Sequence, residues 1–204
     1  MTEGLFIGIF VFAIVSGMVA NAAYHYFCSR NEIKFNKTEY MEFEKIISDY
    51  FDKHRMPKGT LPPDILKHIK YTVDYDAKLP KGVEGRRDSS KKHIEINEDL
   101  YLEDRMFALA HEIAHDIRGD VGVATRDGHS TFFPKRSRDE QACDYIAAAL
   151  LLPLEDMKSI TQQYMRLSKS RRLRLIKEIA REKNVREEVV FRRIREVTII
   201  IEEE

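Results

Sequence analysis

The longest apolar run of the chain lies near its start. From Leu5 to Phe27 there is no Asp, Glu, Lys or Arg, and a helix of that length crosses a lipid bilayer. Tyr24, Tyr26 and Phe27 gather at one end, as an interfacial aromatic belt does. Basic residues follow the run and none precedes it, so the positive-inside rule puts the rest of the chain in the cytoplasm. The pattern predicts a single-pass transmembrane helix at 1–28; a cleaved signal peptide and a buried core helix are the alternatives.

After a polar linker at 29–37 the pattern becomes that of a folded domain. Thr38–Lys53 has apolar residues at helical spacing, and Met56–Pro63, which holds three prolines and a glycine, predicts a connection. The next segments predict a short helix, a strand, a polar loop and a second strand: Ile65–Ile69, Tyr71–Tyr75, Leu79–Lys92 and His93–Asn97. We expect His93–Asn97 either to be an edge strand that holds an extended peptide or to be an ordinary core strand.

Two further helices follow. The first has Asp104 as its candidate N-cap and Gly119 as its stop, with apolar residues at helical spacing: Phe107, Ala110, Ala114 and Ile117. The second begins at Asp139, is almost wholly apolar after Asp144 and is closed by Pro153. It should therefore be buried. The charged segment between the helices, Asp120–Arg138, predicts a loop, which is a candidate lid over the junction of the two helices.

The last part of the chain is helical and basic. Leu173–Ala180 and Arg186–Val197, joined by a short turn, have the spacing of a helix-turn-helix, and the β-branched Val197–Ile201 predicts a final strand. Six arginines are candidates to contact phosphates: Arg171, Arg172, Arg174, Arg192, Arg193 and Arg195. Interleaved glutamates favour the alternative, a helical hairpin packed on the preceding domain. A basic face there would also be attracted to anionic lipid.

Composition bounds the class of protein. The chain has 204 residues and a formal net charge of zero, so it shows no overall bias toward polyanions. Its two cysteines, Cys28 and Cys143, lie in or beside predicted buried segments. A disulfide framework is therefore not expected, and a reducing compartment fits.

The candidate chemistry lies in an H-E-x-x-H box. His111 and His115 are four residues apart in a predicted helix, so both imidazoles project from one face and reach one Zn²⁺. Glu112 then lies beside the metal, where it serves as the general base that takes a proton from water. The alternative is a pair of ordinary helix histidines.

A catalytic zinc site needs a third protein ligand. Glu140 is the main candidate, because it lies on the first turn of the second predicted helix, and His129 in the loop is the other. Asp144, one turn after Glu140, is placed to accept the free N–H of a zinc-bound histidine. His129 and Tyr145 are also candidates to stabilise an oxyanion. The alternative for both acids is that they stabilise the helix N-terminus.

These helices resemble those of the ImmA/IrrE family of gluzincin-type metallopeptidases. In that family the H-E-x-x-H helix is followed by a helix of pattern E-x-x-A-(N/D)-x-F-A-x-x-L-L-x-P, matched here by Glu140, Cys143, Asp144, Ile146, Ala147 and Leu150–Pro153. Cys143 stands where alanine is usual, and Ile146 where phenylalanine is usual. Gly85 before the strand His93–Asn97 is also similar to the family. The resemblance spans about Thr38 to Glu196.

The resemblance implies an α+β, zincin-like fold with a small sheet and a helical C-terminal part. It also implies a protein substrate of the helix-turn-helix repressor class. We therefore expect a membrane anchor at 1–28, a zinc metallopeptidase domain at 38–155 and a helical subdomain at 156–204. The expected activity is that of a zinc endopeptidase with a cytoplasmic catalytic part and no nucleic-acid partner. The alternative is a nucleic-acid-binding regulator whose metal is structural or absent.

Overall fold

The computed structural model describes residues 35–120, 123–127 and 137–202. The predicted transmembrane helix at 1–28, the linker up to Lys34 and His129 lie outside the described residues. Among the helices that are described, none has the length and apolarity needed to cross a membrane. Phe35–Glu204 forms one compact unit with its own hydrophobic core.

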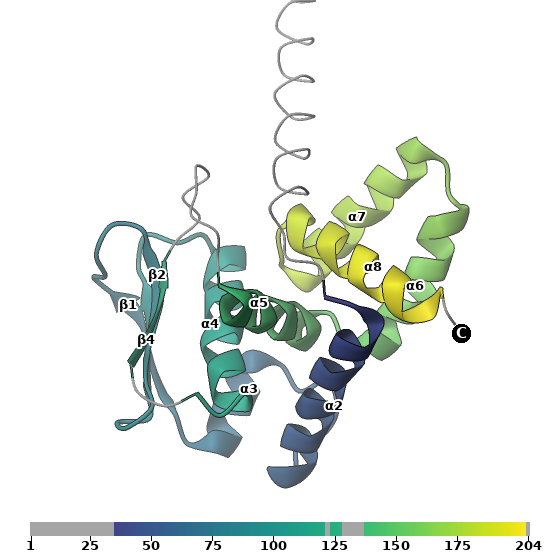
Figure 1. Cartoon of the computed structure of the whole chain (residues 1–204). Coiled ribbons are helices and arrows are strands. Elements are labelled where there is room, and N and C mark those ends of the chain that lie inside the picture. Colours follow the sequence, from purple (N-terminus) through teal and green to yellow (C-terminus); the bar gives the residue numbers. More distant parts are fainter. Residues whose placement is uncertain (1–34, 121–122, 128–136, 203–204) are drawn as a thin grey trace, which may run out of the picture. The chain divides into compact units, whose positions relative to one another are not determined.

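The unit is an α+β fold with a four-stranded sheet (Figure 1). The strands are β1 (Thr72–Ala77), β2 (Val83–Asp88), β3 (His93–Asn97) and β4 (Val123–Asp127). The helices are α2 (Lys37–Lys53), α3 (Pro62–Ile69), α4 (Leu102–Ile117), α5 (Arg138–Leu151), α6 (Leu154–Arg166), α7 (Lys169–Lys183) and α8 (Glu187–Ile201). The helices predicted from the sequence up to Pro153 are therefore confirmed as α2, α3, α4 and α5, with ends shifted by a few residues.

The sheet differs from the expectation in three ways. First, the segment Asp120–Arg138, predicted to be a loop, contains strand β4. The strand order is β1-β3-β2-β4, with β1 parallel to β3 and the other pairs antiparallel. Of the two alternatives for His93–Asn97, the core strand is therefore confirmed, and the edge strand is excluded because β3 lies inside the sheet. The predicted loop Leu79–Lys92 contains β2, whose polar residues hide its strand character: Arg87 is fully buried and donates to the Asp120 carbonyl oxygen at 2.8 Å.

Helix α4 is the centre of the unit, between the sheet and α5 (Figure 1). It is buried on several sides, and Ala108, Leu109, Ile113 and Ala114 have no exposed surface. It begins after Tyr101 and ends before Gly119, which has the positive φ (78°) of a helix stop. Asp104 is not its N-cap but lies within its first turn and forms an ion pair with Arg186.

Helix α5 is held against α4 by an almost unbroken apolar surface. Ser137 is its N-cap and accepts from the Glu140 backbone N–H at 3.1 Å. Every residue from Gln141 to Leu151 is buried. Pro153 follows the helix, as expected, and is the N-cap residue of α6. From the first turn of this buried helix, Glu140 points toward the histidines of α4.

The C-terminal helices α6, α7 and α8 lie on the side of α5 away from the sheet (Figure 1). Val197–Ile201 is the end of α8, not a strand. Its β-branched residues continue the helical spacing of a buried face, which is formed by Val190, Ile194, Val197 and Ile200. Packing of this face on α2, α5 and α6 outweighs the local β preference.

Three of the six candidate arginines make contacts within the unit instead: Arg172, Arg192 and Arg193. Arg193 is fully buried and donates to the Leu152 carbonyl oxygen at 3.0 Å and to Glu44 at 2.7 Å. Arg192 pairs with Glu196 at 2.7 Å. For Arg192 and Arg193 the favoured alternative, a helical hairpin packed on the preceding domain, is therefore confirmed, because α8 turns them toward the neighbouring helices.

Candidate metal centre

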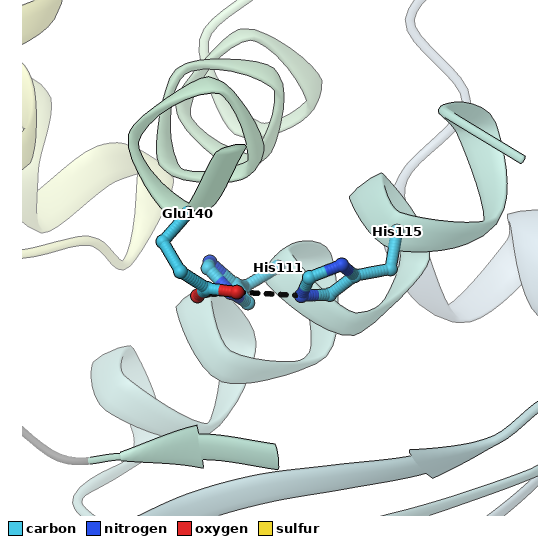
Figure 2. Close-up of side chains that lie close together, drawn as sticks. All are labelled: His111, His115 and Glu140. Carbon is cyan, nitrogen blue, oxygen red and sulfur yellow. Dashed lines mark hydrogen bonds and ion pairs between the residues drawn. The ribbon is translucent and has the colours of Figure 1, made fainter. Parts of the chain in front are cut away.

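Two helices bring three metal-binding side chains together. His111 and His115 lie one turn apart on α4, with ring centroids 5.0 Å apart, and both are buried. Glu140 reaches them from α5 (Figure 2). Its Oε2 is 3.1 Å from His111 Nε2, and its Oε1 is 3.6 Å from His115 Nε2. One ligand atom from each residue lies within 4.8 Å of the other two. The structure thus assembles the set proposed from the spacing of the sequence.

The other nitrogen of each imidazole faces a carboxylate. His111 Nδ1 is 2.9 Å from Asp144 Oδ1, and His115 Nδ1 is 2.8 Å from Asp120 Oδ2. With a metal bound, each ring would carry its proton on Nδ1, donate to its carboxylate and direct the Nε2 lone pair toward the metal. Asp144 therefore lies where it was expected. Asp120 was missed, although its place just after the α4 stop at Gly119 was a usable signal.

The electrostatics favour the protonation states of metal ligands. Burial lowers the pKa of His115, which keeps its imidazole neutral. The hydrogen bond with His111 lowers the pKa of Glu140, against the opposing effect of burial. Neutral imidazoles and an ionised carboxylate are the forms that bind a metal.

The residues fit Zn²⁺. Within the described part of the chain the buried His115 Nε2 has no hydrogen-bond partner, although burying a ring nitrogen in this way is costly. A metal at the point shared by His111, His115 and Glu140 would satisfy it. Two imidazole nitrogens and one carboxylate oxygen are a donor set typical of catalytic zinc.

A second group of potential ligands, His115, Asp120 and Cys143, shares a residue with the first. It would bind through His115 Nδ1, which already faces Asp120 and lies 3.4 Å from Cys143 Sγ. Burial raises the pKa of Cys143 to about 12, so the side chain is a thiol and not the thiolate that metals bind. We therefore interpret Asp120 and Cys143 as residues that hold the His115 ring in place, and not as metal ligands.

Glu112 lies on the sheet side of α4 and is fully buried. It approaches β2 at Gly85: a Cβ on Gly85 would lie 3.0 Å from Glu112 Oε1 and 3.3 Å from its Cγ. Only glycine leaves this space for the glutamate at the present spacing of strand and helix. This gives a physical reason for the glycine that the sequence singled out.

The structure does not bring Tyr145 to the metal-binding cluster. Its hydroxyl donates to Glu44 at 2.6 Å, and its ring stacks on Tyr40 at a centroid distance of 4.9 Å. Adjacent helix positions point about 100° apart, so Tyr145 faces α2 while Asp144 faces α4. The expected oxyanion role is therefore corrected for Tyr145. His129, the other candidate, lies outside the described residues.

Asp144 also connects the cluster to the C-terminal helices. Its Oδ2 lies 3.5 Å from Arg192 on α8, while its Oδ1 faces His111. The side chain of Asp144 is only 4% exposed, so this contact is poorly screened by water. The position of His111 thus depends on α8 as well as on α4 and α5.

Comparison with known families agrees with this arrangement. The family model described as IrrE N-terminal-like domain, Peptidase_M78, matches residues 66–195. The chain belongs to this family. The matched residues include the H-E-x-x-H helix, α5 and most of α8, so the resemblance inferred from the two helices is confirmed.

Among solved structures, the chain has a weak likeness to one regulator. A chain described as a Mycobacterium tuberculosis transcriptional regulator is 21% identical over 82% of this chain and 48% of its own length, with a TM-score of 0.47. The present chain thus spans about half of that protein, and a likeness this weak carries no argument about function. No curated protein matches the chain.

Proposed function

We propose that this protein is a zinc-dependent endopeptidase of the IrrE N-terminal-like family. The observation that carries the proposal is the convergence of His111 Nε2, His115 Nε2 and a Glu140 carboxylate oxygen, with a carboxylate behind each imidazole. When bound there, Zn²⁺ would act as a Lewis acid and lower the pKa of water to near neutrality.

Glu112 is the proposed general base. It is the residue after a proposed ligand and is not part of the ligand cluster. Its carboxylate accepts the proton of the attacking water and then delivers that proton to the amine that leaves when the peptide bond breaks. Gly85 leaves the space that the carboxylate occupies on the sheet side. Asp144 and Asp120 hold the imidazoles in one tautomer.

The substrate is proposed to be an extended segment of a protein. Strand β4 lies at the edge of the sheet next to β2, which carries Gly85 beside Glu112. An edge strand binds a peptide by adding a strand to the sheet. We assign this role, one of the two alternatives considered for His93–Asn97, to β4. A helix-turn-helix repressor is the substrate class that the family resemblance favours.

The test separates chemistry from metal binding. Cells producing the wild-type chain, Glu112→Gln or the matched control Glu103→Gln on the same helix are compared by mass spectrometry of new protein N-termini. We expect Glu112→Gln to retain about one zinc per chain but to lose cleavage by orders of magnitude. The control should cleave as the wild type does. Cleavage by Glu112→Gln at the wild-type rate would contradict the mechanism, and a chain without zinc would favour the regulator alternative.

We also propose that the apolar segment at 1–28 anchors the enzyme in a membrane, with the catalytic unit in the cytoplasm. The support is the uncharged run Leu5–Phe27 and the basic residues after it. The chain should resist carbonate extraction and keep its N-terminal residues, and external protease should not reach a C-terminal tag. A mature protein that begins at Ala23 and lies outside the cell would identify a signal peptide instead.

A further inference from the structure

We propose that an exposed basic row on α7 binds the anionic headgroups of a lipid surface. The row consists of Lys169, Leu173, Lys177 and Arg181, which follow one another at intervals of four residues and therefore share one helix face. Arg174 flanks the row. This proposal goes beyond the peptidase function and does not depend on it.

The charges of the row are not neutralised by the protein. Lys169, Arg174, Lys177 and Arg181 are exposed, and none of them forms an ion pair with another described residue. No Asp or Glu occurs from Met157 to Lys177, although the whole chain has a formal net charge of zero, and Glu178 and Glu182 lie only at the Arg181 end of the row. The excess of positive charge is therefore local, and it creates an attractive field for anions at this face.

The direction of the row is fixed by packing on the opposite side of α7. Ile176, Ile179 and Ala180 are buried there. At the start of the helix Arg172 donates to the carbonyl oxygens of Tyr164 and Met165, at 3.0 and 2.9 Å. This arginine thus ties the α6–α7 corner together and is not available to a ligand. The row itself must face outward.

The apolar member of the row favours lipid over nucleic acid. Leu173 is 52% exposed in the middle of the basic residues, and Met165 at the nearby end of α6 is also exposed. An apolar side chain among basic ones is typical of helices that lie in a membrane interface, where it enters the acyl boundary while the cations meet phosphates. A nucleic acid offers no comparable apolar layer along its backbone.

Helix α8 does not provide the second part of a DNA-reading motif. Recognition by a helix-turn-helix needs a second helix with a free face for the major groove. From Val189 to Ile201 every residue of α8 is buried or half-buried against the rest of the unit. The sequence also places the uncharged segment Leu5–Phe27 in the same chain. A tether of that kind would keep the row close to headgroups at high effective concentration.

The chain contains no tryptophan, so one substitution provides a specific reporter. The full-length chain with Leu173→Trp is reconstituted into nanodiscs of phosphatidylcholine, with or without phosphatidylglycerol. We expect a blue-shifted emission, quenched by brominated acyl chains, only in the anionic discs and reversed by high salt. Tyr101→Trp, an exposed position at the start of α4, is the matched control and should show neither change.

Charge removal tests the row itself. Each basic residue near an anionic surface contributes about a fivefold factor in binding. Adding Lys177→Gln and Arg181→Gln to the reporter should therefore lower the ratio of docked to undocked protein about 25-fold, with an unchanged circular dichroism spectrum. Equal emission of the reporter in neutral and anionic discs would overturn the proposal. So would a shift caused by a duplex oligonucleotide in neutral discs.

Lipid binding by the row can be tested separately from the anchor proposal. If the full chain does not insert into discs of either composition, the anchor at 1–28 fails. Co-sedimentation of the same chain with neutral or anionic vesicles then tests the row alone. Binding to anionic vesicles that the double substitution abolishes would support the row, and equal recovery with both vesicles would refute it.

Discussion

The two carboxylates behind the imidazoles should contribute unequally to zinc affinity. Asp144 and Asp120 lie at almost the same distance from their histidines, 2.9 and 2.8 Å. Their surroundings differ, because the side chain of Asp144 is 4% exposed and that of Asp120 is 39% exposed. Water screens the interaction of Asp120 more strongly. The structure therefore predicts that losing the Asp144 carboxylate weakens zinc binding more than losing the Asp120 carboxylate does.

The expected sizes follow from this difference. Removing a carboxylate that orients a metal-binding histidine lowers metal affinity by about 10- to 100-fold. We place Asp144→Ala at about 100-fold and Asp120→Ala at about tenfold, which correspond to about 2.7 and 1.4 kcal/mol of binding free energy. The asparagine variants keep an acceptor oxygen but lose the charge, so each should lose less affinity than its alanine counterpart.

The assay is competition for Zn²⁺ against a chromophoric chelator, with thermal melts to establish that each variant is folded. Asp76→Ala, an exposed carboxylate on β1, is the control and should bind zinc as the wild type does. If Asp144→Ala does not fold, Asp144→Asn supplies the comparison. Affinities of both alanine variants within twofold of the wild type would refute the proposed support of the histidines, and a larger loss for Asp120→Ala would refute the screening argument.

Two further predictions concern the packing around the site. Glu44→Ala should destabilise the fold by about 3–5 kcal/mol in urea unfolding, because it leaves the fully buried Arg193 without its carboxylate at 2.7 Å. Glu42→Ala, at an exposed position of the same helix, is the control and should change the free energy of unfolding by less than about 0.5 kcal/mol. Equal effects of the two substitutions would contradict the argument. Gly85→Ala places a Cβ 3.0 Å from Glu112 Oε1, so peptidase activity should fall roughly three- to tenfold through a shift of a few tenths of an ångström, at unchanged zinc content. Full activity of that variant would show that Glu112 does not need the space.

Where the sequence predicted correctly, the information was local. Helices α2, α4 and α5 follow from apolar residues at helical spacing, and the stop of α4 follows from Gly119. The placement of His111 beside His115 needs only the pitch of one helix. These features depend on residues within a few positions of one another, so they can be predicted from a single sequence.

Where the sequence failed, the deciding partner lay far away along the chain. The residues of strand β2 are mostly polar, but Arg87 is buried and donates to the carbonyl oxygen of Asp120 and to the hydroxyl of Tyr71, the latter at 3.4 Å. The β-branched residues at the end of α8 predict a strand, but burial against other helices makes this segment helical. In both segments the long-range contacts outweigh the local preference.

The sequence by itself determined the box on α4, the apolar surface of α5 and the order of most elements, because these follow from periodicity along one segment. Only the tertiary structure decided that β3 is interior, that Asp120 supports His115 and that Tyr145 turns toward Glu44. Each of these depends on how separate segments are rotated and paired in space. That rotation is set by the fit of whole faces in the core, which no local pattern records.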